Sequence, residues 1–344
     1  MKPNVAPPSH RHDNVAPASR RLLEVVVLSG KGGAGKTSVA ASFAALADRP
    51  VIVDCDVDAP NMHLVLKPVV RERGGFRSGW EASIDPAACG RCGRCATECR
   101  FGAIVRPGTR EEHWRVEPLF CEGCGACERV CPRHAIAMRE AERGEWLRSD
   151  TRFGPLIHAR MAPGAENSGK LVAFLRKKAQ DVAGANGAGL ILCDGPPGIG
   201  CPAIATLSGA DHVVFVTEPS ASGLHDLERA VDLAARFRLP GSLFINKADL
   251  DSEQADRAVR FAAHRGLALL GSAAYDPAFT LAQMRGLTVV ESNSAGASAA
   301  LRAAWIRLQE TLAEQEKRRP AFRVTASQPN PSPSPERPAT GQPT

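Results

Sequence analysis

Residues 30–37 are the most chemically informative stretch of this sequence, because they read G-x-x-x-x-G-K-T. This pattern wraps the phosphates of a nucleotide when it joins a strand to a helix. Here it follows an apolar run at 22–28 and precedes a predicted helix at 36–47. The loop N–H groups and the helix N-terminus would then face the same anion, with Lys36 reaching the β- and γ-phosphates and Thr37 coordinating Mg²⁺. The predicted nucleotide-binding residues of the loop are Gly30, Gly32, Gly33, Ala34, Gly35, Lys36, Thr37 and Ser38.

Two further predicted strands end in acidic residues. The strand at 51–53 is followed by Asp54, Asp56 and Asp58, and the strand at 190–193 is followed by Asp194 and a Gly-Pro-Pro-Gly turn. In a doubly wound sheet, the carboxyl ends of neighbouring strands open onto the nucleotide crevice. We therefore expect Asp194 to hold Mg²⁺ through water and Asp56 to orient the attacking water. Aspartates at strand ends also cap turns for structural reasons, and this stays the alternative for all four.

Eight of the eleven cysteines form two groups with the same spacing, C-x₂-C-x₂-C-x₃-C. This is the bacterial ferredoxin spacing, in which three thiolates of one group and the fourth of the other hold each 4Fe-4S cluster. The sequence therefore predicts two clusters. The ligands of the first are Cys89, Cys92, Cys95 and Cys131, and those of the second are Cys121, Cys124, Cys127 and Cys99.

Zinc is the alternative metal, because C-x₂-C pairs also build zinc sites, although two complete four-cysteine groups favour clusters. The same grouping argues against a disulfide framework and predicts a reducing compartment. Of the remaining cysteines, Cys55 and Cys193 lie in or beside apolar strands and are expected to be small buried side chains. Cys201 could meet its counterpart in a symmetric dimer, but one thiolate per subunit is too few for a shared cluster.

These residues need a scaffold, and the rest of the sequence predicts one in which strands and helices alternate. Such alternation is typical of a parallel sheet with helices on both faces. The predicted strands are 22–28, 51–53, 190–193, 212–217, 242–245 and 267–270, and the later predicted helices are 224–237, 255–264 and 298–316. The expected fold class is α/β, with a doubly wound, mainly parallel sheet.

One region does not fit the alternation. Residues 82–139 are rich in Cys, Gly and Arg and have no long apolar period, so we expect a small α+β ferredoxin domain inserted in an exposed loop. The predicted organisation is an unstructured tail at 1–21, a P-loop ATPase domain at 22–78 and 142–316, the inserted two-cluster domain at 79–141 and an unstructured tail at 317–344.

The formal net charge of +6 lies in the two predicted tails, which carry +3 and +4 and leave about −1 for the rest of the chain. A nucleic-acid site needs its positive charge clustered on a folded face, so we expect no nucleic-acid partner. No run reaches the roughly 18 apolar residues of a spanning helix, and the N-terminus has no apolar signal segment. We expect a cytoplasmic protein without stable membrane association. A membrane-surface role for 298–316 is the alternative to packing on the sheet.

The stretches GKGGAGKT, VDCDVDAPN and CDGPPGIG resemble the deviant Walker A ATPases of the MinD, ParA and nitrogenase iron protein group, over about residues 22–70 and 150–316. The resemblance implies a Mg²⁺-dependent ATPase that forms a homodimer with ATP. In that family the lysine matching Lys31 crosses the dimer interface to the other subunit's nucleotide. The resemblance therefore implies that Lys31 acts in trans. The catalytic residues expected on this basis are Lys31, Lys36, Asp56 and Asp194. With its two cysteine groups, the chain is similar to the branch that carries an inserted ferredoxin domain and is often labelled cobyrinic acid a,c-diamide synthase-like.

The identity of the base is less constrained. The segment FINKADL contains Asn246-Lys247-x-Asp249, a pattern that reads guanine at a strand end in GTPases. The resemblance favours ATP, with Asn246 contacting adenine, and GTP stays open as the alternative.

An ATPase joined to a two-cluster electron carrier predicts that ATP-driven dimer closure controls electron transfer to an unidentified redox partner, by analogy with nitrogenase iron protein. The alternative is a carrier or assembly ATPase that delivers clusters or metal to an apo-metalloprotein. Four thiolates per cluster favour retention over delivery. A MinD-like partitioning role and an amidating synthetase are less favoured, because the sequence shows neither a basic C-terminal membrane helix nor a glutaminase-like segment.

Overall fold

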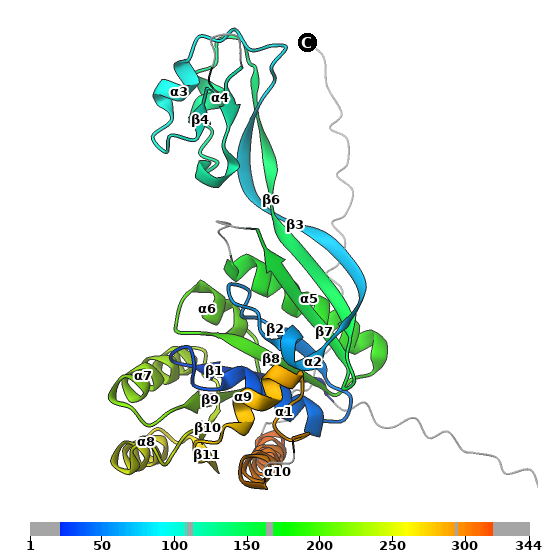
Figure 1. Ribbon diagram of the computed structural model, residues 1–344, viewed down its shortest axis with the longest axis vertical. Helices are drawn as coiled ribbons and strands as arrows, with labels where there is room; N and C mark the ends of the chain where they lie inside the picture. The colour runs from blue at the N-terminus through cyan, green and yellow to red at the C-terminus, as the bar shows by residue number, and fades with distance from the viewer. Residues whose placement is uncertain (1–20, 107, 109–112, 163–167, 293–294, 319–344) are drawn as a thin grey trace, which may run out of the picture.

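The protein has a large α/β body and a small cysteine-rich lobe, joined by a two-stranded ribbon (Figure 1). The computed structural model describes residues 21–106, 108, 113–162, 168–292 and 295–318, so nearly all of both predicted tails lies outside the described residues.

Nine strands of the described residues form one sheet in the order β11-β10-β9-β1-β8-β2-β7-β6-β3. Their bounds are β1 Leu23–Ser29, β2 Val51–Asp54, β3 Val69–Ile84, β6 Ile136–Asp150, β7 Pro155–Met161, β8 Leu190–Pro197, β9 His212–Thr217, β10 Gly241–Ile245 and β11 Ala268–Ser272. All neighbours from β11 to β7 pair in parallel, whereas β6 runs antiparallel to both β7 and β3. The prediction of an α/β fold with a mainly parallel sheet is therefore confirmed.

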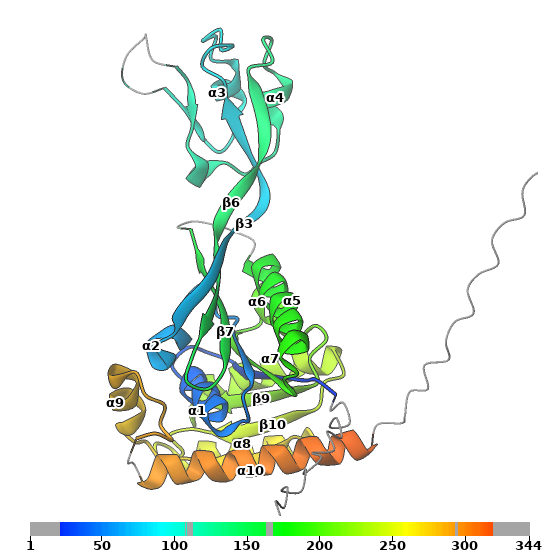
Figure 2. The same cartoon turned by 90° about the vertical axis from the view of Figure 1, so that its right-hand side faces the viewer.

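Helices cover both faces of this sheet (Figure 2). One face packs against α5 Ser168–Asn186, α6 Cys201–Leu207, α7 Ala221–Arg236 and α8 Ser252–His264. The other packs against α1 Lys36–Leu46, α2 Met62–Leu66, α9 Ala278–Arg285 and α10 Ala295–Arg318. Buried apolar residues fill both layers, since each parallel strand is covered on two sides.

The apolar stripe of α10 is part of this core. Leu301, Trp305 and Leu308 are buried, and the Trp305 ring lies 5.3 Å from the ring of Phe43 in α1. The stripe therefore packs on the sheet, and the membrane-surface alternative for this helix is wrong. In the part of the chain that the structure describes, no helix is both long enough and apolar enough to traverse a bilayer.

Two long strands carry the chain from the body to the lobe. β3 and β6 pair from Val69 opposite Asp150 to Ile84 opposite Ile136, but β7 accompanies β6 only as far as the pair of Gly144 with Met161. Beyond that pair the two strands continue alone. The predicted domain limits at 78/79 and 141/142 fall inside these strands.

The lobe itself, residues 85–135, has little regular structure. Its elements are α3 Arg94–Glu98, β4 Ile104–Val105, β5 Arg115–Val116, the 3-10 turn η1 Pro118–Phe120 and α4 Ala126–Arg129. A small apolar cluster holds it together, with the buried side chains Ala82, Cys95, Ile104, Cys127 and Ile136 at its centre. The lobe and the phosphate loop are thus separate regions linked by hydrogen-bonded strands.

Candidate functional site

The carboxyl ends of β1, β2, β8, β9 and β10 bring most of the predicted nucleotide site together. The phosphate loop follows β1 and turns into α1 through Gly35, which has a φ of 92° and stands directly before Lys36. A Cβ on Gly32 or Gly33 would meet no atom within 4 Å, so this side of the loop is open to a ligand. At Gly30 a Cβ would come within 2.4 Å of Asp226, which explains why this position has no side chain.

The predicted catalytic side chains of the loop and of the strand ends form one cluster. The Lys36 Nζ lies 2.7 Å from Asp194 Oδ1 and 3.7 Å from Asp56 Oδ2. The Thr37 hydroxyl donates to the other Asp194 oxygen at 2.6 Å. Burial favours the neutral form of Lys36, but attraction to Asp194 and then to Asp56 outweighs it, so the pKa of Lys36 is raised. The lysine keeps the charge that binding a phosphate requires.

Asp54 has different contacts from its neighbour Asp56. Its buried carboxylate accepts the N–H groups of Asp56 and Met62, at 3.2 and 3.1 Å. Burial, followed by the nearby Asp194, raises the pKa of Asp54 to about 8. Burial also raises the pKa of Asp56. Asp54 therefore shapes the turn after β2, while Asp58 is exposed on that turn.

Lys31, the second lysine of the phosphate loop, is bound within its own chain. Its Nζ lies 2.6 Å from Glu218 Oε1 and donates to the hydroxyls of Ser220 and Ser222 at 3.3 and 3.2 Å. Lys247 holds the other oxygen of Glu218 at 2.8 Å and also donates to the carbonyl of Gly33. Burial would raise the pKa of Glu218, but the hydrogen bonds from the two lysines outweigh it and lower that pKa.

Glu218 is a residue that the sequence did not single out. It follows β9, and it contacts Lys31 and Lys247 only because the sheet places three strand ends side by side. No local spacing in the sequence could have paired these residues.

The two predicted base-reading residues lie apart. Asn246 is buried, and its side-chain amide donates to the carbonyl of Ala34 at 3.0 Å, so it braces the phosphate loop. Asp249 is exposed further along the same connection and accepts the backbone N–H of Tyr275 at 2.5 Å.

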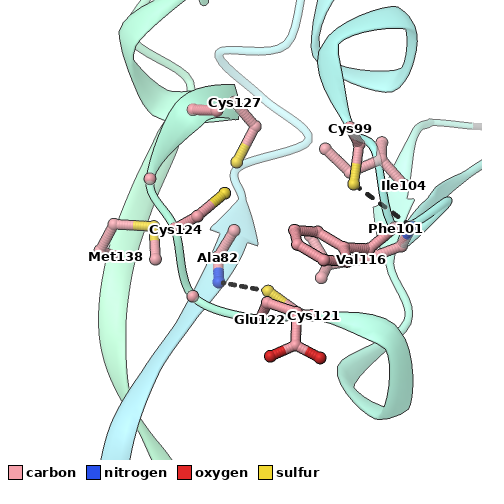
Figure 3. A pocket seen from close by; sticks show the side chains of 14 residues that line it. Ala82, Cys99, Phe101, Ile104, Val116, Cys121, Glu122, Cys124, Cys127 and Met138 are labelled. Atoms are coloured by element: carbon pink, nitrogen blue, oxygen red, sulfur yellow. Dashed lines mark hydrogen bonds between the residues drawn. The ribbon is translucent and has the colours of Figure 1, made fainter.

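Each of the two cysteine cavities in the lobe is lined by the four cysteines that the sequence predicts together. One cavity is lined by Cys99, Cys121, Cys124 and Cys127 (Figure 3). The other is lined by Cys89, Cys92, Cys95 and Cys131. We call the cavity lined by Cys89, Cys92, Cys95 and Cys131 the first centre and the other cavity the second centre. All eleven cysteines are free, and Cys55 and Cys193 are fully buried in the body, as expected from their apolar strands.

The two centres have the same local construction. The helices α3 and α4 each begin after a glycine in the left-handed region, Gly93 and Gly125. The N–H of Ala103 donates to the sulfur of Cys99, and the N–H of Ala135 donates to that of Cys131, both at 3.3 Å. A further N–H, from Ala82, donates to the sulfur of Cys121 at 3.4 Å.

A single metal ion has no ready site. Among the described residues, no three or more His, Cys, Asp or Glu side chains are arranged to hold one ion. Four thiolates on one zinc ion would lie about 3.8 Å from each other, since each sulfur lies about 2.3 Å from the metal. Burial raises the pKa of the Cys95 and Cys127 thiols, so binding any metal group there must release protons.

Comparison with known proteins identifies the body of the chain. Residues 25–289 match the CobQ/CobB/MinD/ParA nucleotide binding domain, which is most of the sequence. The chain belongs to this family. The uncharacterised protein MJ0578 of Methanocaldococcus jannaschii is 33% identical over 236 residues, which cover 67% of this chain and 80% of that protein.

Solved structures of similar fold include MinD proteins. MinD of Pyrococcus horikoshii complexed with Mg-ADP aligns with a TM-score of 0.51 and 16% identity, and the alignment covers 86% of this chain and 97% of that one. The cell division ATPase MinD of Pyrococcus furiosus aligns with a TM-score of 0.50 and 19% identity, covering 84% and 99%. The family is therefore one of nucleotide-binding domains, and the match at 25–289 includes the residues of the cysteine lobe.

Proposed function

We propose that this protein is an ATP-hydrolysing iron–sulfur protein, in which nucleotide-driven closure of a homodimer controls electron transfer through two 4Fe-4S clusters. The observation that carries the proposal is the separation of the eight lobe cysteines into two cavities, each lined by one complete ligand set of the ferredoxin spacing.

The ATPase half rests on the cluster of Lys36, Thr37, Asp56 and Asp194. Asp194 forms an ion pair with Lys36 and accepts a hydrogen bond from the Thr37 hydroxyl. An incoming phosphate would replace Asp194 as the partner of Lys36. Thr37 and Asp194 would then be free to hold Mg²⁺, directly and through water, and Asp56 would orient the attacking water. The Mg-ADP complex of the similar MinD supports this choice of ligand.

The fit of the cysteine lobe to two clusters rests on its donor set. Each cavity offers four thiols, and backbone N–H groups donate to the sulfurs of Cys99, Cys121 and Cys131. Hydrogen bonds to the sulfurs are among the factors that set the potential of a bound cluster. Apolar side chains such as Phe101, Ile104, Val116 and Met138 line the rest of the second centre. When bound, 4Fe-4S clusters supply one-electron chemistry over roughly −700 to +450 mV.

Coupling between the two halves would pass through the sheet. β2 ends at the turn that carries Asp56, β7 pairs with β2, β6 pairs with β7, and β6 and β3 extend as the ribbon into the lobe (Figure 1). A rearrangement at the nucleotide therefore has a continuous hydrogen-bonded route to the cysteines. In the dimer, Lys31 would leave Glu218 and reach the nucleotide of the other subunit.

The test is a reductive titration of the oxygen-free protein with and without ATP, with Lys36→Ala as the control that cannot hold the nucleotide. We expect ATP to change the potential or the rate of reduction in the parent chain but not in the control. A response that is the same with and without ATP, together with release of iron to an apo-protein acceptor, would replace this proposal with the carrier function.

A further inference from the structure

The two cysteine centres share a backbone plan but differ in the charges around them. Three arginines, Arg91, Arg94 and Arg133, line the first centre, and no Asp or Glu of the described residues lines it. All three are exposed, and within the described residues none forms an ion pair with a carboxylate. The guanidinium of Arg91 lies 3.1 Å from Nε2 of His113. The first centre therefore lies in a positive field.

The second centre has the opposite surroundings. Its lining contains one carboxylate, Glu122, and no Lys or Arg of the described residues. Figure 3 shows Glu122 beside Cys121, with Phe101, Ile104, Val116 and Met138 around the same cavity. The Glu122 carboxylate disfavours additional negative charge, because like charges repel. Apolar side chains line both cavities, so only the charged side chains distinguish the two centres.

We propose that the first centre has the higher reduction potential, so that electrons within the lobe move from the second centre to the first. This inference rests on the proposed function, since it assumes that both centres hold 4Fe-4S clusters. Reduction adds one negative charge to a cluster, and the net charge around a cluster is one of the factors that set its potential. Three cations stabilise that added electron, and one anion opposes it.

Hydrogen bonds to sulfur occur at both centres, where the backbone N–H groups of Ala96 and Glu128 also donate to the sulfurs of Cys95 and Cys127. The N–H groups of Ala82 and Ala103 donate at the second centre and that of Ala135 donates at the first. Each is a neutral dipole at 3.3–3.4 Å, whereas the arginines and Glu122 carry full charges whose fields extend further. The charges should therefore decide the order of the two potentials.

The transfer inside the lobe balances by itself. One electron leaves the second centre, which is oxidised by one unit, and the same electron reduces the first centre, with no proton or bond transferred. The first electron must come from a one-electron reductant, for which dithionite serves in the test. The charges that set the order belong to the lobe itself, so the test is made without nucleotide.

The experiment is a dithionite titration of the reconstituted full chain, monitored by electron paramagnetic resonance. It uses two charge variants and one matched control. The first variant is the triple Arg91→Gln, Arg94→Gln and Arg133→Gln, and the second is Glu122→Gln. The control removes three exposed arginines from the α/β body, as Arg236→Gln, Arg257→Gln and Arg260→Gln, and so has the same net charge as the first variant.

We expect two midpoints in the parent chain. The triple variant of the lobe should lower the higher midpoint, Glu122→Gln should raise the lower one, and the body control should leave both in place. A lobe variant that lowers the lower midpoint, or that moves neither, would overturn the ordering while the clusters themselves stand. Absence of iron from the reconstituted parent would instead remove the proposed function.

Discussion

Lys31→Ala gives the sharpest test of the ATPase half of this account. In the structure Lys31 is not free, because Glu218, Ser220 and Ser222 hold its ammonium group. The contact from the phosphate loop to Asp194 is made by Lys36, so removing the Lys31 side chain leaves that contact in place. We therefore expect nucleotide binding to persist. Turnover should fall about 10³-fold or more, which is the low end of the range for a cation that reaches the transferring phosphoryl group from a second subunit.

To act in trans, Lys31 must first break its contacts within its own chain, and the free energy of these contacts opposes the trans role. The Lys31 and Glu218 side chains are 31% and 17% exposed, so their ion pair is partly hydrated. Pairs of this kind contribute about 0.2–1 kcal/mol, which corresponds to less than about a tenfold change in an equilibrium. Glu218→Gln should therefore alter turnover less than about tenfold, and it should raise turnover if release of Lys31 limits dimer closure.

The assay compares ATP hydrolysis at saturating nucleotide with binding of a fluorescent ATP analogue, for the parent chain, Lys31→Ala and Glu218→Gln. An unchanged turnover in Lys31→Ala would refute the trans role. Equal losses in the two variants would also refute it, because they would show that the pair matters only as an intrachain contact.

Two further predictions concern binding and stability. Gly35→Ala should weaken nucleotide binding by about tenfold or more, since a Cβ there would lie 2.4 Å from the Asn246 amide and φ is 92°; Gly184→Ala, on an open helical site, is the control, and equal affinities would contradict the reasoning. Burial lowers the pKa of His212 to about 4, so the unfolded state binds the extra proton between about pH 6.5 and 4 and stability falls as pH falls through that window. In denaturant unfolding, the free energy of unfolding should change between these pH values by about 3 kcal/mol less in His212→Gln than in the parent chain. The exposed His225→Gln is the control and should behave like the parent chain. If the free energy of unfolding of His212→Gln varies with pH as steeply as that of the parent chain, this assignment is refuted.

The parallel part of the sheet could be predicted because burial on two sides leaves apolar runs in the sequence. The segments that became β1, β2 and β9 are almost entirely buried. β3 could not be found in this way. Only three of the 16 residues in its sequence, VVRERGGFRSGWEASI, are buried, and its pairing with β6 holds it in place. The start of α5 was accessible, because the sequence predicts a helix start with Asn167 or Ser168 as its cap. α5 begins at Ser168, and its buried side chains Leu171, Val172, Leu175 and Ala179 have helical spacing.

The candidate site was partly accessible to sequence reasoning, and the limit lay in long-range pairing. Motif spacing alone brought out Lys36, Thr37 and Asp194, because the chemistry of a phosphate loop fixes which residue types follow each strand. The contacts of Lys31 with Glu218, and of Asn246 with the loop carbonyl of Ala34, depend on strand order. Strand order was not readable from the sequence. The charge difference between the two cysteine centres likewise appears only once the cavities are formed.

The measurement that tests the central claim most directly is the iron and acid-labile sulfide content of protein purified without oxygen. Two 4Fe-4S clusters require about eight iron atoms and about eight sulfides per chain, with the broad visible absorbance of iron–sulfide charge transfer. We expect Cys127→Ala, which removes a buried thiol of the second centre, to lose about half of both. Cys201→Ala, which removes an exposed thiol outside the two centres, should lose neither. A colourless parent protein without iron or sulfide would contradict the account.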